Sequence, residues 1–307
     1  MSEERERENL RIRESPEGRS YRQIAEHMKR YQELRRTALK NLEKVKHIII
    51  ITSTKGGVGK SIVTTNVAAG LALKGARVGV FDIDFHGPSV HKLLGLSTGM
   101  GLPVALDGSV IPVTVQPLGI KVVSIGLLLK SEDDAVIWRG PIKASAVNEL
   151  LAYVDWGELD FLLVDTPPGT GDEVLTLIQM IPREIAGIVL VTTPSEISVS
   201  VVRKAASFAR QLKAPILGIV ENMSYLRCGS SGEIIYVFGE SKGERLAKEL
   251  STRFLGAIPL DPEIRMFEDR GVPIVVGAPE RESSQAFMRV VEKILEALSE
   301  EKRSQNA

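Results

Sequence analysis

One segment, from Ile48 to Ala69, constrains the fold more than any other part of the chain. It begins with the four apolar residues Ile48–Ile51, passes through a glycine-rich loop at 54–61, and continues into a helical pattern at 62–69. Four β-branched residues in a row predict a strand buried on both faces. Glycines let a loop turn several N–H groups toward an anion, and a helix that starts there adds the positive end of its dipole. Strand, glycine loop and helix in this order predict a phosphate-binding site.

The residues of the loop indicate which phosphate compound it binds. The loop reads Thr54-Lys55-Gly56-Gly57-Val58-Gly59-Lys60-Ser61. We expect this backbone to surround the phosphates of a nucleotide, Lys60 to reach the β- and γ-phosphates, and the Ser61 hydroxyl to ligate Mg²⁺. A glycine turn without a ligand is the alternative. Nucleotide binding is favoured because strand, loop, lysine, hydroxyl and helix all agree.

Two positions distinguish this loop from the usual phosphate-binding loop. Thr54 stands where the usual loop has its first glycine, and Lys55 is a second lysine inside the loop. This pattern resembles the deviant loop of the MinD/ParA-like P-loop ATPases. The resemblance implies a homodimer in which Lys55 acts in catalysis by reaching across to the nucleotide of the partner.

Acidic residues end two further predicted strands. Asp82 and Asp84 end a strand that starts at Arg77, and Asp165 ends one that starts at Phe161. The carboxyl ends of parallel strands share the edge at which open sheets bind ligands. We therefore expect Asp84 to orient the attacking water, Asp82 to support the Mg²⁺ shell, and Asp165 to hold Mg²⁺ through water. The alternative for Asp84 and Asp165 is that each caps the turn after it.

Three more residues are expected around the nucleotide. Gly169, in the loop after Asp165, is placed to offer its N–H to the γ-phosphate. Asn222 ends the predicted strand at 216–221, and its carboxamide has both the donor and the acceptor that pair with adenine. Pro259 follows the strand that begins at Leu255 and is expected to wall the base.

Predicted strands that alternate with helical stretches indicate an α/β fold with a doubly wound, mostly parallel sheet flanked by helices, as in a P-loop NTPase. We divide the chain into a charged, partly helical extension at 1–46, an ATPase domain at 47–299 and a flexible tail at 300–307. Residues 1–19 are expected to be flexible. After them, spacings of three and four predict a helix, with Arg35 filling one gap in its apolar stripe. The stripe comprises Tyr21, Ile24, Met28, Tyr31, Ala38, Leu42 and Val45.

That helix either lies on the core domain, which we favour, or contacts a dimer partner or client.

The C-terminal helix is expected to pack on the domain because its polar face has mixed charge. Its apolar face comprises Phe287, Val290, Val291, Ile294, Leu295 and Leu298. A strand near 121–125 and a crossover helix at 195–212 complete the expected order. Trp138 is either an interface anchor or plain core.

Charge and composition limit the partners. Residues 1–46 carry 13 Lys and Arg against 9 Asp and Glu, a net charge of +4, so the remainder carries −4. An acidic core is a poor partner for nucleic acid. No apolar run is long enough to span a membrane, and no apolar signal core is found, so we expect a cytoplasmic protein that binds no membrane. His86 and His91 lack partners at metal-ligand spacing and are expected to be surface or turn histidines.

Several motifs together resemble the Mrp/ApbC-type iron–sulfur cluster carrier ATPases. They lie at 82–89 (DIDFHGPS), 138–141 (WRGP), 165–173 (DTPPGTGDE), 221–225 (ENMSY) and 261–265 (DPEIR). The resemblance extends over residues 45–297. It implies a dimeric, Mg²⁺-dependent ATPase that assembles iron–sulfur clusters or delivers them to apo-proteins. A reductase of the nitrogenase type is not indicated, because residues 166–174 contain no cysteine.

The single cysteine, Cys228, departs from the pattern of this family. The family has a Cys-x-x-Cys pair at this place, and two such pairs from a dimer bridge one [4Fe–4S] cluster. Here Cys228 holds the first position and Ser231 the second, and a hydroxyl is a poorer iron ligand than a thiolate. Two alternatives to cluster delivery stay open. One is an ATP-switched scaffold without metal; the other is a MinD/ParA-type spatial regulator, against which the C-terminal helix and the acidic core argue.

Overall fold

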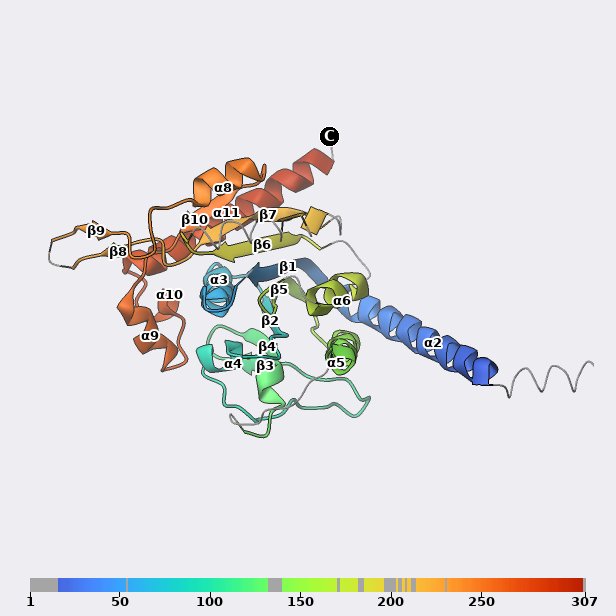
Figure 1. The fold of residues 1–307 in the computed structure, drawn as a ribbon. Coiled ribbons are helices and arrows are strands. Elements are labelled where there is room, and N and C mark those ends of the chain that lie inside the picture. Colours follow the sequence, from blue (N-terminus) through green and yellow to red (C-terminus); the bar gives the residue numbers. More distant parts are fainter. Residues whose placement is uncertain are drawn as a thin grey trace, which may run out of the picture.

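A computed structural model describes residues 16–53, 55–131, 140–169, 172–181, 185–195, 203, 206–207, 209–210, 214–229 and 231–305. Its described strands form an eight-stranded sheet in the order β10-β7-β6-β1-β5-β2-β4-β3 (Figure 1). The neighbouring strands are parallel except for the edge pair β3 and β4. The strands are β1 Val45–Ser53, β2 Val78–Asp82, β3 Val113–Val115, β4 Ile120–Ser124, β5 Leu159–Asp165, β6 Gly187–Thr192, β7 Ile216–Glu221 and β10 Phe254–Ala257. The predicted mostly parallel sheet is confirmed.

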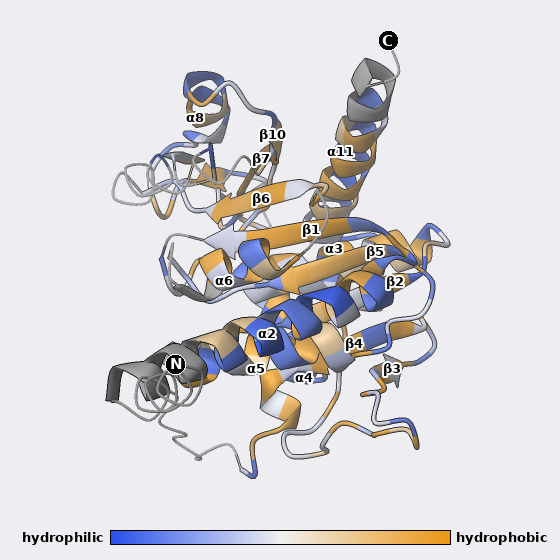
Figure 2. Ribbon diagram, turned by 90° about the vertical axis from the view of Figure 1, so that its right-hand side faces the viewer, coloured by the Kyte–Doolittle hydropathy of each residue, from blue (hydrophilic) through white to orange (hydrophobic). Residues whose placement is uncertain are grey.

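The centre of the sheet is β1, which lies between β5 and β6. Ile48 and Ile50 pack into the hydrophobic cluster on one face, and Ile49 and Ile51 pack into the cluster on the other. Successive side chains of a strand point to opposite faces, so a strand with helices on both sides has to be apolar throughout. Figure 2 shows β1, β5 and β6 as hydrophobic along most of their length.

Helices cover both faces, as predicted for a doubly wound fold. The helices are α2 Pro16–Leu42, α3 Lys60–Leu73, α4 Val90–Leu93, α5 Gly140–Tyr153, α6 Asp172–Met180, α8 Gly243–Glu249, α9 Pro262–Glu268, α10 Ile274–Gly277 and α11 Glu282–Gln305, with a 3₁₀ turn, η1, at Ile125–Leu127. Residues of α2, α5 and α6 belong to the cluster of Ile48, and residues of α3, α10 and α11 belong to that of Ile49. Most of the crossover helix expected at 195–212 lies outside the described residues.

The N-terminal helix lies on the core domain, as we favoured, but it starts earlier and its apolar stripe differs. It begins at Pro16, its last two turns bury Ala38 and Leu42, and its N-terminal part extends away from the sheet (Figure 1). Leu34, and not Arg35, fills the gap in the stripe, and Met28 is 59% exposed. Helical geometry explains the change, because positions 34, 38 and 42 share one face.

Two domain boundaries differ from those expected. Strand β1 starts at Val45, inside the extension assigned to 1–46. Helix α11 continues to Gln305, so most of the tail assigned to 300–307 is helical. The buried face predicted for α11 is confirmed for Phe287, Val290 and Ile294 among others. No helix in the described ranges has the length and apolar character needed to cross a membrane.

A small hairpin follows β7 and stands apart from the main sheet (Figure 1). Its strands, β8 Leu226–Arg227 and β9 Ile234–Ile235, pair antiparallel. Cys228 lies in the turn between them. After the turn, the five residues at 234–238 are all apolar and each is 40–49% exposed.

Candidate nucleotide-binding site

The glycine loop connects the carboxyl end of β1 to the start of α3, at Lys60, as predicted. Gly57 and Gly59 have φ of 77° and 78°, in the left-handed region. A Cβ on Gly59 would lie 2.2 Å from Nδ2 of Asn222, so glycine is required there for space as well as for backbone conformation. Thr54 lies outside the described residues.

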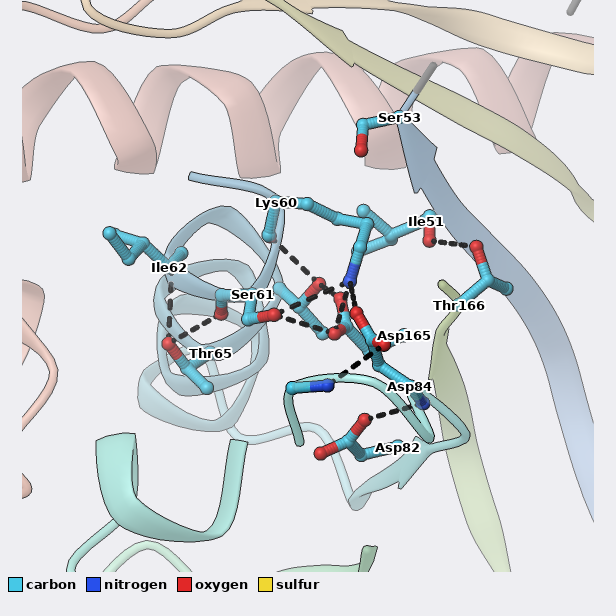
Figure 3. A network of polar contacts seen from close by, with 12 residues as sticks. Ile51, Ser53, Lys60, Ser61, Ile62, Thr65, Asp82, Asp84, Asp165 and Thr166 are labelled. Atoms are coloured by element: carbon cyan, nitrogen blue, oxygen red, sulfur yellow. Dashed lines mark hydrogen bonds and ion pairs between the residues drawn. The ribbon is translucent and has the colours of Figure 1, made fainter. Parts of the chain in front are cut away.

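The residues predicted for phosphate and Mg²⁺ gather next to this loop (Figure 3). The buried Lys60 ammonium lies 2.5 Å from Oδ2 of Asp165, at the end of β5, and 3.9 Å from Oδ2 of Asp84, just after β2. Ser61 Oγ donates to the same Oδ2 of Asp165 at 2.7 Å. Four residues from three separate segments therefore meet in one largely buried cluster, where Coulombic interactions are strong.

Sequence reasoning missed a further partner of Asp165. The Thr64 hydroxyl donates to Oδ1 of Asp165 at 2.5 Å, and both side chains are fully buried. Thr64 lies four residues after Lys60 on α3, so the two side chains share a helix face. That spacing is the signal that could have identified it. Thr64, Ser61 and Lys60 together hold the carboxylate in one orientation.

Asp84 caps the turn after it, which is the alternative that we weighed against a catalytic role. Its Oδ1 accepts the N–H groups of His86 and Gly87, at 3.1 and 3.3 Å, and so caps the turn. Its Oδ2 is the oxygen near Lys60. The turn thus fixes the carboxylate and leaves one oxygen near the Lys60 ammonium.

Asp82 supports that turn from behind. It is fully buried; its Oδ1 accepts the N–H of Asp84 at 3.0 Å, and its Oδ2 accepts the hydroxyl of Ser124 at 2.8 Å. Burial, followed by the negative charge of Asp165, raises the pKa of Asp82 from 3.8 to about 7.

The raised pKa of Asp82 predicts how stability depends on pH. Between about pH 4 and pH 7 the folded protein holds a proton that the unfolded chain has lost, so the free energy of unfolding falls as pH rises through this window. One proton corresponds to a slope of about 1.4 kcal/mol per pH unit. We expect Asp82→Asn to remove this contribution in urea unfolding between pH 5 and 8. The exposed Asp155→Asn is the control, and a wild-type slope in Asp82→Asn would contradict the assignment.

The other residues predicted for the nucleotide line the same edge of the sheet. Asn222 is buried at the end of β7, and its amide nitrogen donates to the carbonyl of Val58 at 2.9 Å, so it contacts the loop directly. Pro259 is buried just beyond β10. Gly169, with φ of 98°, donates its N–H to the carbonyl of Ser53 at 2.6 Å. Lys55 is exposed.

His86 and His91 have different surroundings. His86 is exposed, as predicted, and its Nε2 lies 2.8 Å from the ammonium of Lys143 on α5. The prediction of a surface or turn position is wrong for His91, which is almost fully buried and lies 3.4 Å from Ser124 Oγ. No group of three or more acidic, histidine or cysteine side chains suited to a metal was found in the described part of the chain. Trp138 lies outside it.

Cys228 is half-buried in a turn that is closed by hydrogen bonds. Its N–H donates to the carbonyl of Glu233, and its carbonyl accepts the N–H of Gly232, at 2.9 and 2.8 Å. The preceding Arg227 binds the carboxylate of Glu282, on α11, with two nitrogens at 2.7 and 3.0 Å, and also donates to Gly232. The guanidinium therefore ties the cysteine turn to the main domain.

The fold and this edge of the sheet define a class. The sheet is mostly parallel, and a glycine loop follows its central strand. A lysine and a serine stand at the start of the helix after the loop, and an aspartate ends the neighbouring strand β5. These are the parts of a P-loop NTPase.

Comparison with known proteins gives the particular family. A family model described as ParA, NUBPL iron-transfer P-loop NTPase, matches residues 44–295. An iron-sulfur cluster carrier protein of Saccharolobus solfataricus is 43% identical over 285 residues, 92% of this chain and 95% of that protein. The cytosolic Fe-S cluster assembly factor NUBP2 of Gallus gallus is 40% identical over 258 residues, 83% of this chain and 94% of that protein.

A solved structure agrees with these relatives. The nucleotide-binding protein of Archaeoglobus fulgidus in complex with ADP has a TM-score of 0.71 and 40% identity, and the match covers 82% of this chain and 96% of that one. The chain belongs to the ParA/NUBPL family of iron-transfer P-loop NTPases.

Proposed function

We propose that this protein is a cytoplasmic, Mg²⁺-dependent ATPase that works as a homodimer and delivers iron–sulfur clusters to apo-proteins. The observation that carries the proposal is the convergence of Lys60, Ser61 and Asp165 at the glycine loop. The names of the relatives from Saccharolobus solfataricus and Gallus gallus support the cluster as cargo, and the second name also supports the compartment. The ADP in the Archaeoglobus fulgidus structure supports an adenine nucleotide.

The donor set fits Mg²⁺. The Ser61 hydroxyl and the Asp165 carboxylate are hard oxygen ligands, 2.7 Å apart, of the kind that Mg²⁺ requires. Ser61 would hold the ion directly and Asp165 would hold it through water. A bound Mg²⁺ supplies charge neutralisation on the phosphate oxygens.

The chain's own residues account for the other parts of hydrolysis. Lys60 exchanges its contact with Asp165 for the β- and γ-phosphates, and Oδ2 of Asp84, 3.9 Å away, orients the attacking water. Gly169 exchanges the carbonyl of Ser53 for the γ-phosphate, so the loop after β5 senses hydrolysis. Asn222 and Pro259 bind the adenine.

The homodimer and the role of Lys55 are tested together. Lys55→Ala and Asp84→Asn are each expected to lower ATP turnover by at least about 10-fold, because each removes a group that acts on the transition state. Each monomer should still bind ATP. Mixed subunits should regain activity, because a mixed dimer has one site with both groups intact. Random pairing at an equal ratio gives about a quarter of the wild-type rate.

Turnover is measured by phosphate release across a series of mixing ratios, with mixed dimers counted by mass spectrometry of differently tagged subunits. Lys44→Ala, which removes another exposed lysine outside the loop, is the control and should keep the wild-type rate. Mixed dimers that form but stay inactive would argue against a shared site.

A second candidate is an ATP-switched scaffold that binds client proteins without metal. It is favoured by Ser231 in the place of a second cysteine, and by the exposed apolar residues at 234–238. Iron uptake separates this scaffold from a cluster carrier.

A further inference from the structure

A chain of buried polar side chains runs from α4 to the turn of Asp84. Ser124 Oγ lies 2.8 Å from Oδ2 of Asp82 and 3.4 Å from Nδ1 of His91, and Nε2 of His91 lies 3.0 Å from Oγ1 of Thr98. Asp82, Ser124 and His91 are each at most 1% exposed. A buried polar group that lacks a hydrogen bond costs free energy. Each contact of this series therefore needs one donor and one acceptor, and this gives the series a direction.

Asp82 ionises above its pKa of about 7; its carboxylate then accepts hydrogen bonds only, and this sets the direction. The Ser124 hydroxyl donates to Asp82, so its oxygen is left to accept the N–H of Gly126, at 3.1 Å, and the Nδ1–H of His91. Nε2 of His91 then accepts the hydroxyl of Thr98. Each hydrogen bond of the series then has one donor and one acceptor.

The packing around His91 requires a glycine at position 126. A Cβ added to Gly126 would lie 2.1 Å from Cε1 of His91. The glycine therefore permits the imidazole to lie against η1, where it reaches Ser124. Ser124 also caps η1 by accepting the N–H of Gly126.

Ser124 is too far from the glycine loop to act on the nucleotide itself. The sheet order places β5 and β2 between β1, which leads into the loop, and β4, which Ser124 ends. Three strand spacings amount to about 14 Å. Ser124 reaches the site only through Asp82, whose other oxygen accepts the backbone N–H of Asp84.

We propose that Ser124 and His91 are positioning residues for ATP hydrolysis: they fix the Asp82 carboxylate, which fixes the turn that directs Asp84 toward Lys60. The proposal rests on the role of Asp84 given under Proposed function. It assigns to β4 and α4, which are separate in sequence from the glycine loop, a part in setting the rate of the chemical step. Orientation of a water-positioning group affects turnover more than ground-state binding.

The test is Ser124→Ala in the full-length protein, assayed for ATP turnover and for binding of ADP. We expect kcat to fall about 10-fold, while KM for ATP and Kd for ADP change less than about 2-fold. Ser124→Thr keeps the hydroxyl and should recover most of the rate. The matched control is Ser284→Ala, another fully buried serine, whose hydroxyl bonds to backbone carbonyls of residues 274 and 278. It should keep the wild-type kcat per folded molecule.

If Ser124→Ala does not fold, Ser124→Cys is used instead, because its thiol is of similar size but is a weak donor. We expect the same loss of kcat in Ser124→Cys. An unchanged kcat in the folded variant, beside an inactive Asp84→Asn, would overturn the positioning role and leave the role of Asp84 intact. An active Asp84→Asn would instead remove the proposed hydrolytic role on which the inference rests.

Discussion

Lys60→Ala is expected to abolish ATP binding, raising Kd by at least about 100-fold, or about 2.7 kcal/mol. Lys60 is buried, and Asp84 and Asp165 both lie within 4 Å of its ammonium. Without the lysine, the carboxylates face the phosphates of ATP with no positive side chain between them. The two carboxylates would then repel the phosphates.

Binding is measured by isothermal titration with ATP and Mg²⁺. The control is Lys74→Ala. Lys74 is a partly exposed lysine just beyond the other end of α3, and it pairs with Glu292. The Kd of this variant for ATP should equal that of the wild type. Removing one partner of a buried ion pair also costs stability, on the order of 3 kcal/mol. The double variant Lys60→Ala with Asp165→Asn leaves no unpaired carboxylate at 165 and provides the measurement should the single variant unfold. Wild-type affinity in a folded variant would contradict a phosphate role for Lys60.

The parts of the site that sequence alone predicted are those carried by local patterns. The strand, the glycine loop and the helix at 48–69 are contiguous, and each residue there has a role that its neighbours make recognisable. The acids at 82, 84 and 165 could be placed because the ends of parallel strands share one edge. For Asp84, the structure adds that one carboxylate both caps the turn and faces Lys60.

The parts that sequence did not predict depend on contacts between distant segments. Ser124 meets Asp82 across a gap of 42 residues, and a serine at a strand end has no distinctive pattern. His91 has no metal partner at ligand spacing, which predicted a surface or turn position, but its ring nitrogens lie near the hydroxyl groups of Thr98 and Ser124. The short elements β3, β8 and β9 have two or three residues each, too few to show a period.

The prediction that Arg35 lies in the stripe of the N-terminal helix was wrong for a related reason. Spacings of three and four fit more than one helix face, and Arg35 or Leu34 completes the pattern equally well. The packing of α2 against α5 decides between them: Asn41 donates to the carbonyl of Ala152 in α5, and Leu34 is buried.

Cys228→Ser is expected to eliminate cluster binding, and Ser231→Cys is expected to strengthen it. The turn of Cys228 is closed by its two bonds to Glu233 and Gly232, so residues 228 and 231 lie within one tight turn. A wild-type dimer offers two thiolates for a [4Fe–4S] cluster, and other ligands such as the Ser231 oxygen, water or a small thiol must complete the coordination. Such a cluster should be labile and readily lost to chelators, whereas Ser231→Cys restores four thiolates.

The measurement is anaerobic reconstitution with iron and sulfide, followed by the visible spectrum, the iron content per dimer and the rate of loss to a chelator. We expect about four iron atoms per dimer in Ser231→Cys and a loss rate at least about 10-fold lower than in the wild type. Ser97→Cys adds a thiol at a distant exposed position and should behave as the wild type does. Cys228→Ser should take up no cluster and still hydrolyse ATP, because the cysteine turn and the glycine loop are separate segments. If neither the wild type nor Ser231→Cys takes up iron, the turn is no cluster site, and the metal-free scaffold with its ATPase activity replaces the carrier.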